Sequence, residues 1–170
     1  MSAAKEQSKP INWGLLISIL LLLVAVIWVG VRIAFPDSPT IFAGTRPDNL
    51  SVTAGKFAPC PSTPNCVSSQ SEDAEHRIEP LTYSGSATDA IAALKKIVQS
   101  QERTKLIAQT DNYLYAEFIS HWMGFVDDVE FYVNEDAGVI EVRSASRLGE
   151  SDLGVNRQRI ESIRTQLNQL

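Results

Sequence analysis

Residues 11–31 read INWGLLISILLLLVAVIWVGV, a stretch of 21 residues without a charged side chain. A bilayer core about 30 Å thick is crossed by about 20 apolar residues in a helix. Trp13 and Trp28 lie toward the two ends, where indole rings favour the membrane interface. A cleaved signal peptide is the alternative, but its apolar region usually has about 7–15 residues, and no A-x-A-like site follows here. The stretch therefore predicts an uncleaved transmembrane anchor over residues 11–35.

The charges that flank this stretch are few. Lys5 and Lys9 precede it, Glu6 opposes them, and Arg32 follows it. Because Lys and Arg are retained on the cytoplasmic side, the count favours a cytoplasmic tail over residues 1–10. We therefore expect a single-pass membrane protein with a periplasmic, lumenal or extracellular domain. Its first partner is membrane lipid, through the N-terminal helix.

The part of the chain after residue 35 is acidic. It holds 12 Lys and Arg residues against 19 Asp and Glu residues, a formal charge of −7. Nucleic-acid binding relies on a basic footprint, so we do not expect a nucleic acid as a partner. A membrane or envelope protein is the candidate macromolecular partner.

Proline and glycine break any regular period over residues 36–58, which predicts a linker before a compact domain over residues 59–170. The domain opens with a proline-rich loop that contains Cys60 and Cys66. Disulfides persist outside the cytoplasm, so we predict a Cys60–Cys66 disulfide. Two alternatives stay open: free or redox-active thiols, and a metal site that the cysteines would form with His76 and His121. The spacing matches no standard zinc pattern, and we predict no metal and no cofactor.

The domain is patterned along its length. A short strand is expected within residues 76–83. Ser86 and Asp89 have the spacing of a capping box, and apolar residues recur at helical spacing up to about residue 100, which predicts a helix there. Four strands are expected at about 104–110, 113–121, 126–134 and 138–146, since short turns rich in Asp, Asn and Gly separate them. A final helix begins near residue 151 or 152 and reaches the C-terminus.

The element order is therefore strand, helix, four strands, helix. Short turns make an antiparallel sheet the simplest arrangement. Helices that cover one face of such a sheet give an α+β two-layer sandwich. The predicted fold is this sandwich, preceded by one N-terminal transmembrane helix.

Two segments are more specific than the rest. One is CPSTPNCVSS at residues 60–69, and the other runs from GFVDDVEF at 124–131 through RSASR at 143–147 to DLGVNRQRI at 152–160. Together they closely resemble the domain-of-unknown-function 1499 family, over about residues 57–168. The resemblance implies domain limits, but it implies no mechanism because the family has no established activity.

Alternate residues of the predicted strands divide between two faces of the sheet. Apolar residues such as Leu114, Val129 and Val142 define the core face. The other face carries eight polar or aromatic residues: Tyr113, Tyr115, Glu117, Asp128, Glu130, Tyr132, Glu141 and Arg143. We expect a solvated face on which Arg143 pairs with Glu130 or Asp128, since antiparallel sheets often have one wet face. The alternative is a recognition surface for a cation or polar ligand.

A second group of charged residues follows the last strand. It contains the candidate ligand-binding residues Arg143, Arg147, Asp152, Asn156, Arg157 and Arg159. Arginines near a helix N-terminus favour an anion or a carboxylate, so a small anion pocket is one interpretation. The other is structural: Asp127 falls on the core face and needs an arginine partner, Asp152 caps the helix, and Arg157 pairs with Glu161.

The sequence contains none of the common catalytic motifs, such as G-x-S-x-G, a P-loop or H-E-x-x-H. Our leading hypothesis is a membrane-anchored extracytoplasmic binding or assembly module. One rival is a hydrolase-like enzyme in which Asp127 serves as acid or base, His121 shuttles protons and the arginines assist. Another is a carrier with a lipid or pigment pocket between the sheet and the final helix.

Overall fold

The computed structural model describes residues 11–38 and 40–170, so the predicted tail over 1–10 lies outside the described residues. The chain divides into two compact units, of which the first ends at Pro36 and the second is Asp37–Leu170. Helix α1, Trp13–Ala34, accounts for the apolar stretch, and the Asn12 side chain caps it by accepting a hydrogen bond from the Leu15 amide. By its length and composition it could cross a membrane, as a signal anchor or a signal peptide does.

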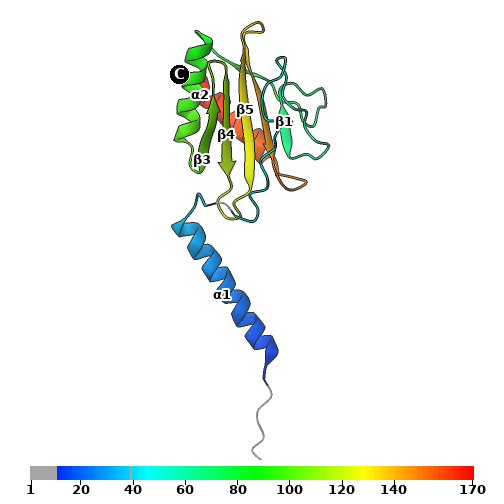
Figure 1. Cartoon of the computed structure of the whole chain (residues 1–170), viewed down its shortest axis with the longest axis vertical. Coiled ribbons are helices and arrows are strands. Elements are labelled where there is room, and N and C mark those ends of the chain that lie inside the picture. Colours follow the sequence, from blue (N-terminus) through cyan, green and yellow to red (C-terminus); the bar gives the residue numbers. More distant parts are fainter. Residues whose placement is uncertain (1–10, 39) are drawn as a thin grey trace, which may run out of the picture. The chain divides into compact units, whose positions relative to one another are not determined.

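The second unit contains a six-stranded antiparallel sheet. Along the sheet the order is β1-β6-β5-β4-β3, and β2 pairs with the start of β6. Figure 1 shows β3, β4 and β5 side by side, with α3 in red behind them. The bounds are Cys66–Ser68 for β1, Leu81–Thr82 for β2, Thr104–Gln109 for β3, Tyr113–Ile119 for β4, Val126–Asn134 for β5 and Val139–Ser146 for β6.

Two helices pack on one face of this sheet: α2, Ala87–Ser100, and α3, Val155–Leu167. The predicted capping box is present, since Ser86 and Asp89 bond to each other's backbone amides. Helix α3 begins about one turn later than expected, because Gly154 takes a left-handed conformation before it. The predicted two-layer sandwich is confirmed, with β1 as a strand that the sequence did not reveal.

The core lies between the sheet and the two helices. Alternate residues of β4, β5 and β6 point into it, as the sequence predicted, and meet Leu94 of α2 and Ile160 and Ile163 of α3. All three of these helix side chains are fully or almost fully buried. Protein side chains therefore fill the centre of the layer between the sheet and α3; a lipid or pigment pocket there stays a prediction.

The outer face of the sheet, opposite the helices, differs from the expectation of a solvated surface. Glu130 is 0% exposed and Asp128 is 1% exposed, and Tyr115, Glu117 and Arg143 are buried too. The reason is that the irregular segment before β1 packs on this face. The Arg46 side chain reaches Glu117, a Cβ built on Gly44 would lie 2.9 Å from the Cβ of Arg147, and Phe57 is itself buried. The prediction of a wet face is therefore wrong.

Candidate functional site

The register of the sheet places the polar residues of the outer face in cross-strand rows. In one row Ser68, Arg143, Glu130 and Tyr115 are successive partners on β1, β6, β5 and β4. In the next row the partners are Cys66, Ala145, Asp128 and Glu117. Directly opposed residues have Cβ atoms about 4.5–5.5 Å apart, so the side chains within a row are neighbours.

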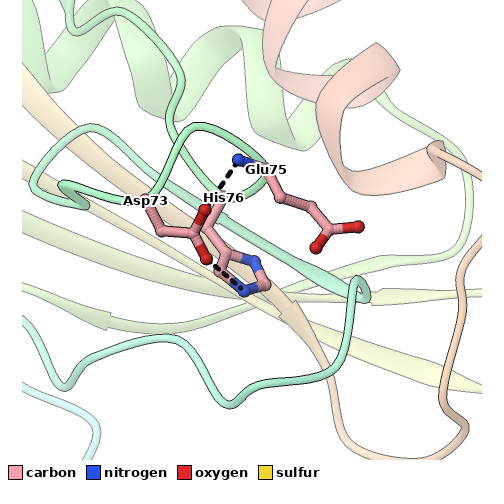
Figure 2. Close-up of side chains that lie close together, drawn as sticks. All are labelled: Asp73, Glu75 and His76. Atoms are coloured by element: carbon pink, nitrogen blue, oxygen red, sulfur yellow. Dashed lines mark hydrogen bonds and ion pairs between the residues drawn. The ribbon is translucent and has the colours of Figure 1, made fainter.

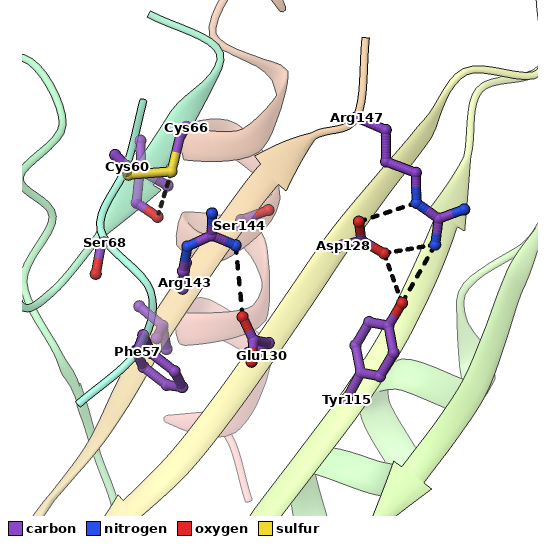
Figure 3. Close-up of polar contacts among 12 residues, drawn as sticks. Phe57, Cys60, Cys66, Ser68, Tyr115, Asp128, Glu130, Arg143, Ser144 and Arg147 are labelled. Carbon is purple, nitrogen blue, oxygen red and sulfur yellow. Dashed lines mark hydrogen bonds and ion pairs between the residues drawn. A yellow bond between two sulfur atoms is a disulfide. The ribbon is translucent and has the colours of Figure 1, made fainter. Parts of the chain in front are cut away.

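Arg147, just past the end of β6, bonds to Asp128 and Glu117 of the second row. Figure 3 shows its contact with Asp128. Its Nε donates to Oδ2 of Asp128 at 2.9 Å and its Nη2 donates to Oδ1 at 2.6 Å, which is the bidentate geometry of a strong arginine–carboxylate pair. Its Nη2 also donates to Glu117 and to the Tyr115 hydroxyl. Arg46 adds a second guanidinium on Glu117, with Nη2 to Oε1 at 2.5 Å. We call Arg46, Tyr115, Glu117, Asp128 and Arg147 the outer-face cluster.

The pKa values of the outer-face cluster follow from this pairing. Burial disfavours the charged form of Arg147, but its bonds to Asp128 and Glu117 outweigh burial and raise its pKa. Burial likewise favours a neutral Glu117, yet Arg147 and Arg46 hold its pKa below the ordinary value. Burial and the hydrogen bond to Asp128 raise the pKa of Tyr115. At neutral pH the Glu117 carboxylate and its two arginines are therefore charged and paired.

Arg143 is the exception on this face. Its side chain is 8% exposed, and its one hydrogen bond among the described residues runs from Nη1 to Oε2 of Glu130 at 3.4 Å. Its Nε is buried without an acceptor. The other Glu130 oxygen accepts from the Tyr113 hydroxyl at 2.8 Å, and burial raises the Glu130 pKa despite both partners. The sequence-predicted pairing of Arg143 with Glu130 is thus present but incomplete.

A cavity of about 350 Å³ adjoins Arg143. Its apolar walls are Pro47, Pro59, Pro61 and Ala145. Its charged groups are Asp128, Arg143 and Arg147. The Cys60–Cys66 disulfide, predicted from the sequence and present here, fastens the Pro59–Pro61 wall to β1. The cavity therefore lies between the outer face of the sheet and a covalently tied loop.

On the core side, the structure brings together Asp127, Asn156 and Arg159. Arg159 donates to Oδ2 of Asp127 at 2.5 Å and to Oδ1 of Asn156 at 2.6 Å. Ser146 donates to the other Asp127 oxygen at 2.5 Å. The fully buried Asn156 also bonds to Ser144 and to the Asn65 carbonyl. Each charged group of this cluster has an internal partner, which is the structural role considered for Asp127 and Arg159.

The remaining residues of the predicted anion pocket bind the backbone. Asp152 accepts from the amides of Gly154 and Asn156, so it caps the start of α3. Arg157 donates to the carbonyls of Arg77 and Glu75 at 2.8 and 2.9 Å. The expected pair with Glu161 is not formed among the described residues, because Arg164 bonds to Glu161 instead. An anion at the N-terminus of α3 stays a prediction.

His121 and Asp127, the weak catalytic candidates, line one groove of about 610 Å³ with Arg103 and Arg159. The His121 ring packs edge-on against Trp122, with centroids 4.5 Å apart. Both carboxylate oxygens of Asp127 already accept hydrogen bonds, from Ser146 and from Arg159. These two bonds give Asp127 a structural role, and a catalytic role for Asp127 and His121 stays a prediction.

The disulfide removes Cys60 and Cys66 from the predicted metal-site alternative, since bonded sulfurs are not the thiolates that a zinc site requires. His76 lies next to Cys66, in a turn with Asp73 and Glu75 (Figure 2), whereas His121 lines the groove beside Asp127. The buried His76 ring bonds through Nδ1 to the Cys66 carbonyl at 2.9 Å, and its Nε2 lies 3.6 Å from Oδ2 of Asp73. These contacts tie the turn to the disulfide-bearing strand.

Sequence reasoning missed Arg46 and the burial of the outer-face cluster. Arg46 falls in a segment without periodicity, so nothing local marks it as the partner of a residue on β4. One signal was present: Asp128 and Glu130 lie two residues apart on one strand face, and Glu117 lies on the next strand. Three neighbouring carboxylates need cations nearby, which predicts arginines against that face.

The chain was compared with protein families and with curated proteins. A family model described as protein of unknown function (DUF1499) matches residues 56–167. No curated protein matches the chain. The matched region contains both cysteines and every arginine from Arg143 to Arg164, and it begins after Arg46. The resemblance drawn from the two sequence segments is therefore confirmed.

Proposed function

The chain belongs to the DUF1499 family of proteins of unknown function, and we propose that this member is a membrane-anchored extracytoplasmic binding module. The observation that carries the proposal is the cavity beside Arg143, where a buried guanidinium retains an unused donor under a disulfide-tied loop. Buried polar groups are nearly always satisfied within a protein, so an exception beside a cavity suggests a ligand.

The location follows from two features. The N-terminal helix is apolar up to Arg32 in its last turn, and the domain contains a disulfide, a bond that persists in oxidising compartments. We propose that α1 is retained as a signal anchor, with the N-terminus cytoplasmic and the unit Asp37–Leu170 on the opposite side of the membrane. The domain would then act next to a lipid surface.

The pairing of the charged groups with one another favours binding over catalysis. Arg147 and Arg159 are held by carboxylates, and Asp127 is bonded through both oxygens. Groups fixed in this way support a rigid surface, whereas a catalytic acid or base must be within reach of a reacting atom. Arg143 differs because its side chain lines the cavity and its Nε has no acceptor among the described residues.

A photoreactive residue at the cavity rim tests this function. Pro61 is exposed and lines the cavity, and Lys96 is exposed on α2, on the opposite side of the sheet. A photoreactive side chain at position 61 of the full chain, in its own membrane, is expected to give a discrete adduct. The same side chain at position 96 serves as the control and should give none. Absence of an adduct at position 61, or equal adducts at both positions, would contradict the proposed binding function.

A further inference from the structure

We propose that the Nε and Nη2 edge of Arg143 binds the carboxylate of a small ligand whose apolar body lies against the proline walls of the cavity. This inference rests on the proposed binding function and names the chemistry of the ligand. Three features support it: the geometry of Arg143, the filled edge of Arg147, and the charges around the cavity.

Arg147 supplies the internal comparison. Its Nε and Nη2 form one edge of the guanidinium, and Asp128 occupies that edge with both oxygens at 2.9 and 2.6 Å. Arg143 lies four residues earlier, on β6, and uses only Nη1, toward Glu130. Its Nε is buried without an acceptor in the part of the chain that the structure describes. The edge that Asp128 fills on Arg147 is therefore unfilled on Arg143.

Among the described residues, no neighbour of Arg143 fills that edge. Its partner on β5, Glu130, faces Nη1, and its partner on β1 is Ser68, whose hydroxyl accepts from the Gln70 amide at 3.2 Å. Figure 3 shows the guanidinium between Glu130 on one side and the strand with Ser68 and the disulfide on the other. Leaving a charged donor buried and unpaired is costly, so an external acceptor at this edge would be stabilised.

The cavity selects the rest of the ligand. Three prolines and Ala145 offer apolar contact, and a volume of about 350 Å³ is at the small end of ligand pockets. The surrounding acids limit the ligand's charge, because Asp128 lines the cavity and Glu117 and Glu130 lie in the adjoining rows. Carboxylates nearby disfavour a dianion, while the planar guanidinium edge matches a singly charged carboxylate.

The test uses the full chain in detergent micelles with benzoate as the probe, because benzoate joins a carboxylate to a small apolar ring. Benzamide is the neutral isostere, and inorganic phosphate is the alternative anion. Arginine Nε–Hε resonances in ¹⁵N-resolved NMR spectra report contact with the guanidinium, and the Arg143→Lys spectrum assigns the Arg143 signal. We expect benzoate to shift that signal in saturable fashion, and benzamide and phosphate to leave it unchanged.

Substitutions at Arg143 then test whether its guanidinium binds benzoate. Arg143→Lys keeps the charge but removes the planar edge. The double variant Arg143→Gln/Glu130→Gln removes both buried charges together, which protects the fold from an unpaired carboxylate. Both are expected to bind benzoate at least about tenfold more weakly, as loss of a charge-assisted hydrogen bond predicts. Arg77→Gln, at an exposed ion pair, is the control and should bind as the native chain does.

Several results would overturn the inference: an unshifted Arg143 signal, equal binding of benzamide, tighter binding of phosphate, or native affinity in the double variant. The adduct at position 61 separates the two proposals. If that adduct forms while benzoate fails, the carboxylate assignment is wrong and the binding module stands. If neither is seen, both proposals fail.

Discussion

Arg147 allows two carboxylates to be buried on the outer face of the sheet. Asp128 and Glu117 are almost inaccessible to water, and each accepts hydrogen bonds from this guanidinium. Replacing a buried ion pair with apolar residues is often neutral, but removing one partner is costly because the other charge stays behind. The residue therefore fixes the structure of this face whether or not it contributes to ligand binding.

Arg147→Met should lower the free energy of unfolding by about 3–5 kcal/mol, because it leaves Asp128 buried without an arginine. Arg77→Met is the matched control. The ion pair between Arg77 and Glu79 is exposed on both sides, so its loss should cost no more than about 1 kcal/mol. Urea unfolding of the full chain in detergent measures both changes. Similar losses in the two variants would show that Arg147 stabilises the fold no more than an exposed ion-pair arginine does.

Glu117 gives the outer-face cluster a predictable pH dependence. Its pKa in the folded chain lies below the ordinary value of 4.5, so the folded state binds fewer protons than the unfolded state near that value. The stability that it contributes is thus present above pH 4.5 and is lost as pH falls through the lowered pKa.

The stability gap between the native chain and Glu117→Gln should therefore be largest at neutral pH and shrink in acid. Urea unfolding midpoints between pH 3 and 7 are suitable for the comparison, with Glu79→Gln as an exposed control. A gap that stays constant over this range, or widens in acid, would contradict the paired state of Glu117.

At the scale of elements, the segment from Thr40 to Cys60 turns an ordinary two-layer sandwich into a domain with a covered outer face. Thr40 bonds to the Met123 carbonyl at 2.7 Å, the Phe42 and Phe125 rings lie 5.4 Å apart, and Arg46 reaches Glu117. These contacts follow neither a helical nor a strand period. They depend on residues about 70 to 80 positions apart in the chain.

This explains which parts of the fold could be predicted. The capping box of α2 and the turns between β3 and β6 depend on neighbouring residues, so local patterns revealed them. Strand β1 has three residues in a proline-rich loop and exists because it pairs with β6, far along the chain. The cover of the outer face is non-local in the same way. The pair of Arg143 with Glu130 could be predicted from the sequence, but neither Arg46 nor the pairing of Arg147 with Asp128 and Glu117 could.

Gly124 tests the contact between Thr40 and the β4–β5 turn. It has φ +73°, and a Cβ built there would lie 2.6 Å from Cγ2 of Thr40. Gly138 has a similar φ of +66° and no atom within 4 Å of such a Cβ, so it is the matched control. Gly138→Ala should cost about 1–2 kcal/mol from the left-handed backbone alone.

Gly124→Ala should cost more than Gly138→Ala, since Thr40 must also move away from the turn. Thermal unfolding of both variants gives the difference. Thr40→Ser, which keeps the hydroxyl and removes the methyl group, should restore part of the loss in the Gly124→Ala background. Equal costs at the two glycines would mean that the segment does not pack tightly on the turn.

The disulfide ties the proline wall of the cavity to β1 across a short ring. In the chain-entropy description, closing a loop this short contributes about 2 kcal/mol. The Cys60→Ser/Cys66→Ser variant is therefore expected to lose about that much stability while the sheet persists, as far-UV circular dichroism would show. An unchanged unfolding midpoint would indicate that the loop is held by its packing and not by the bond.

Two physical features of the chain support the proposed location. The apolar helix is stable in lipid, and the acidic domain after it should be repelled by an anionic lipid surface. The family match covers residues 56–167 and therefore does not include the helix. On the proposed anchoring, this repulsion would disfavour close approach of the domain to an anionic bilayer.

The most direct test is the state of the two cysteines in the cells that make the protein. Cells are lysed with a large maleimide present, membranes are separated from the soluble fraction, and labelling is repeated after reduction. We predict a full-length chain in the membrane fraction whose cysteines are modified only after reduction. A chain in the soluble fraction, with both thiols modified without reduction, would contradict an anchored domain in an oxidising compartment.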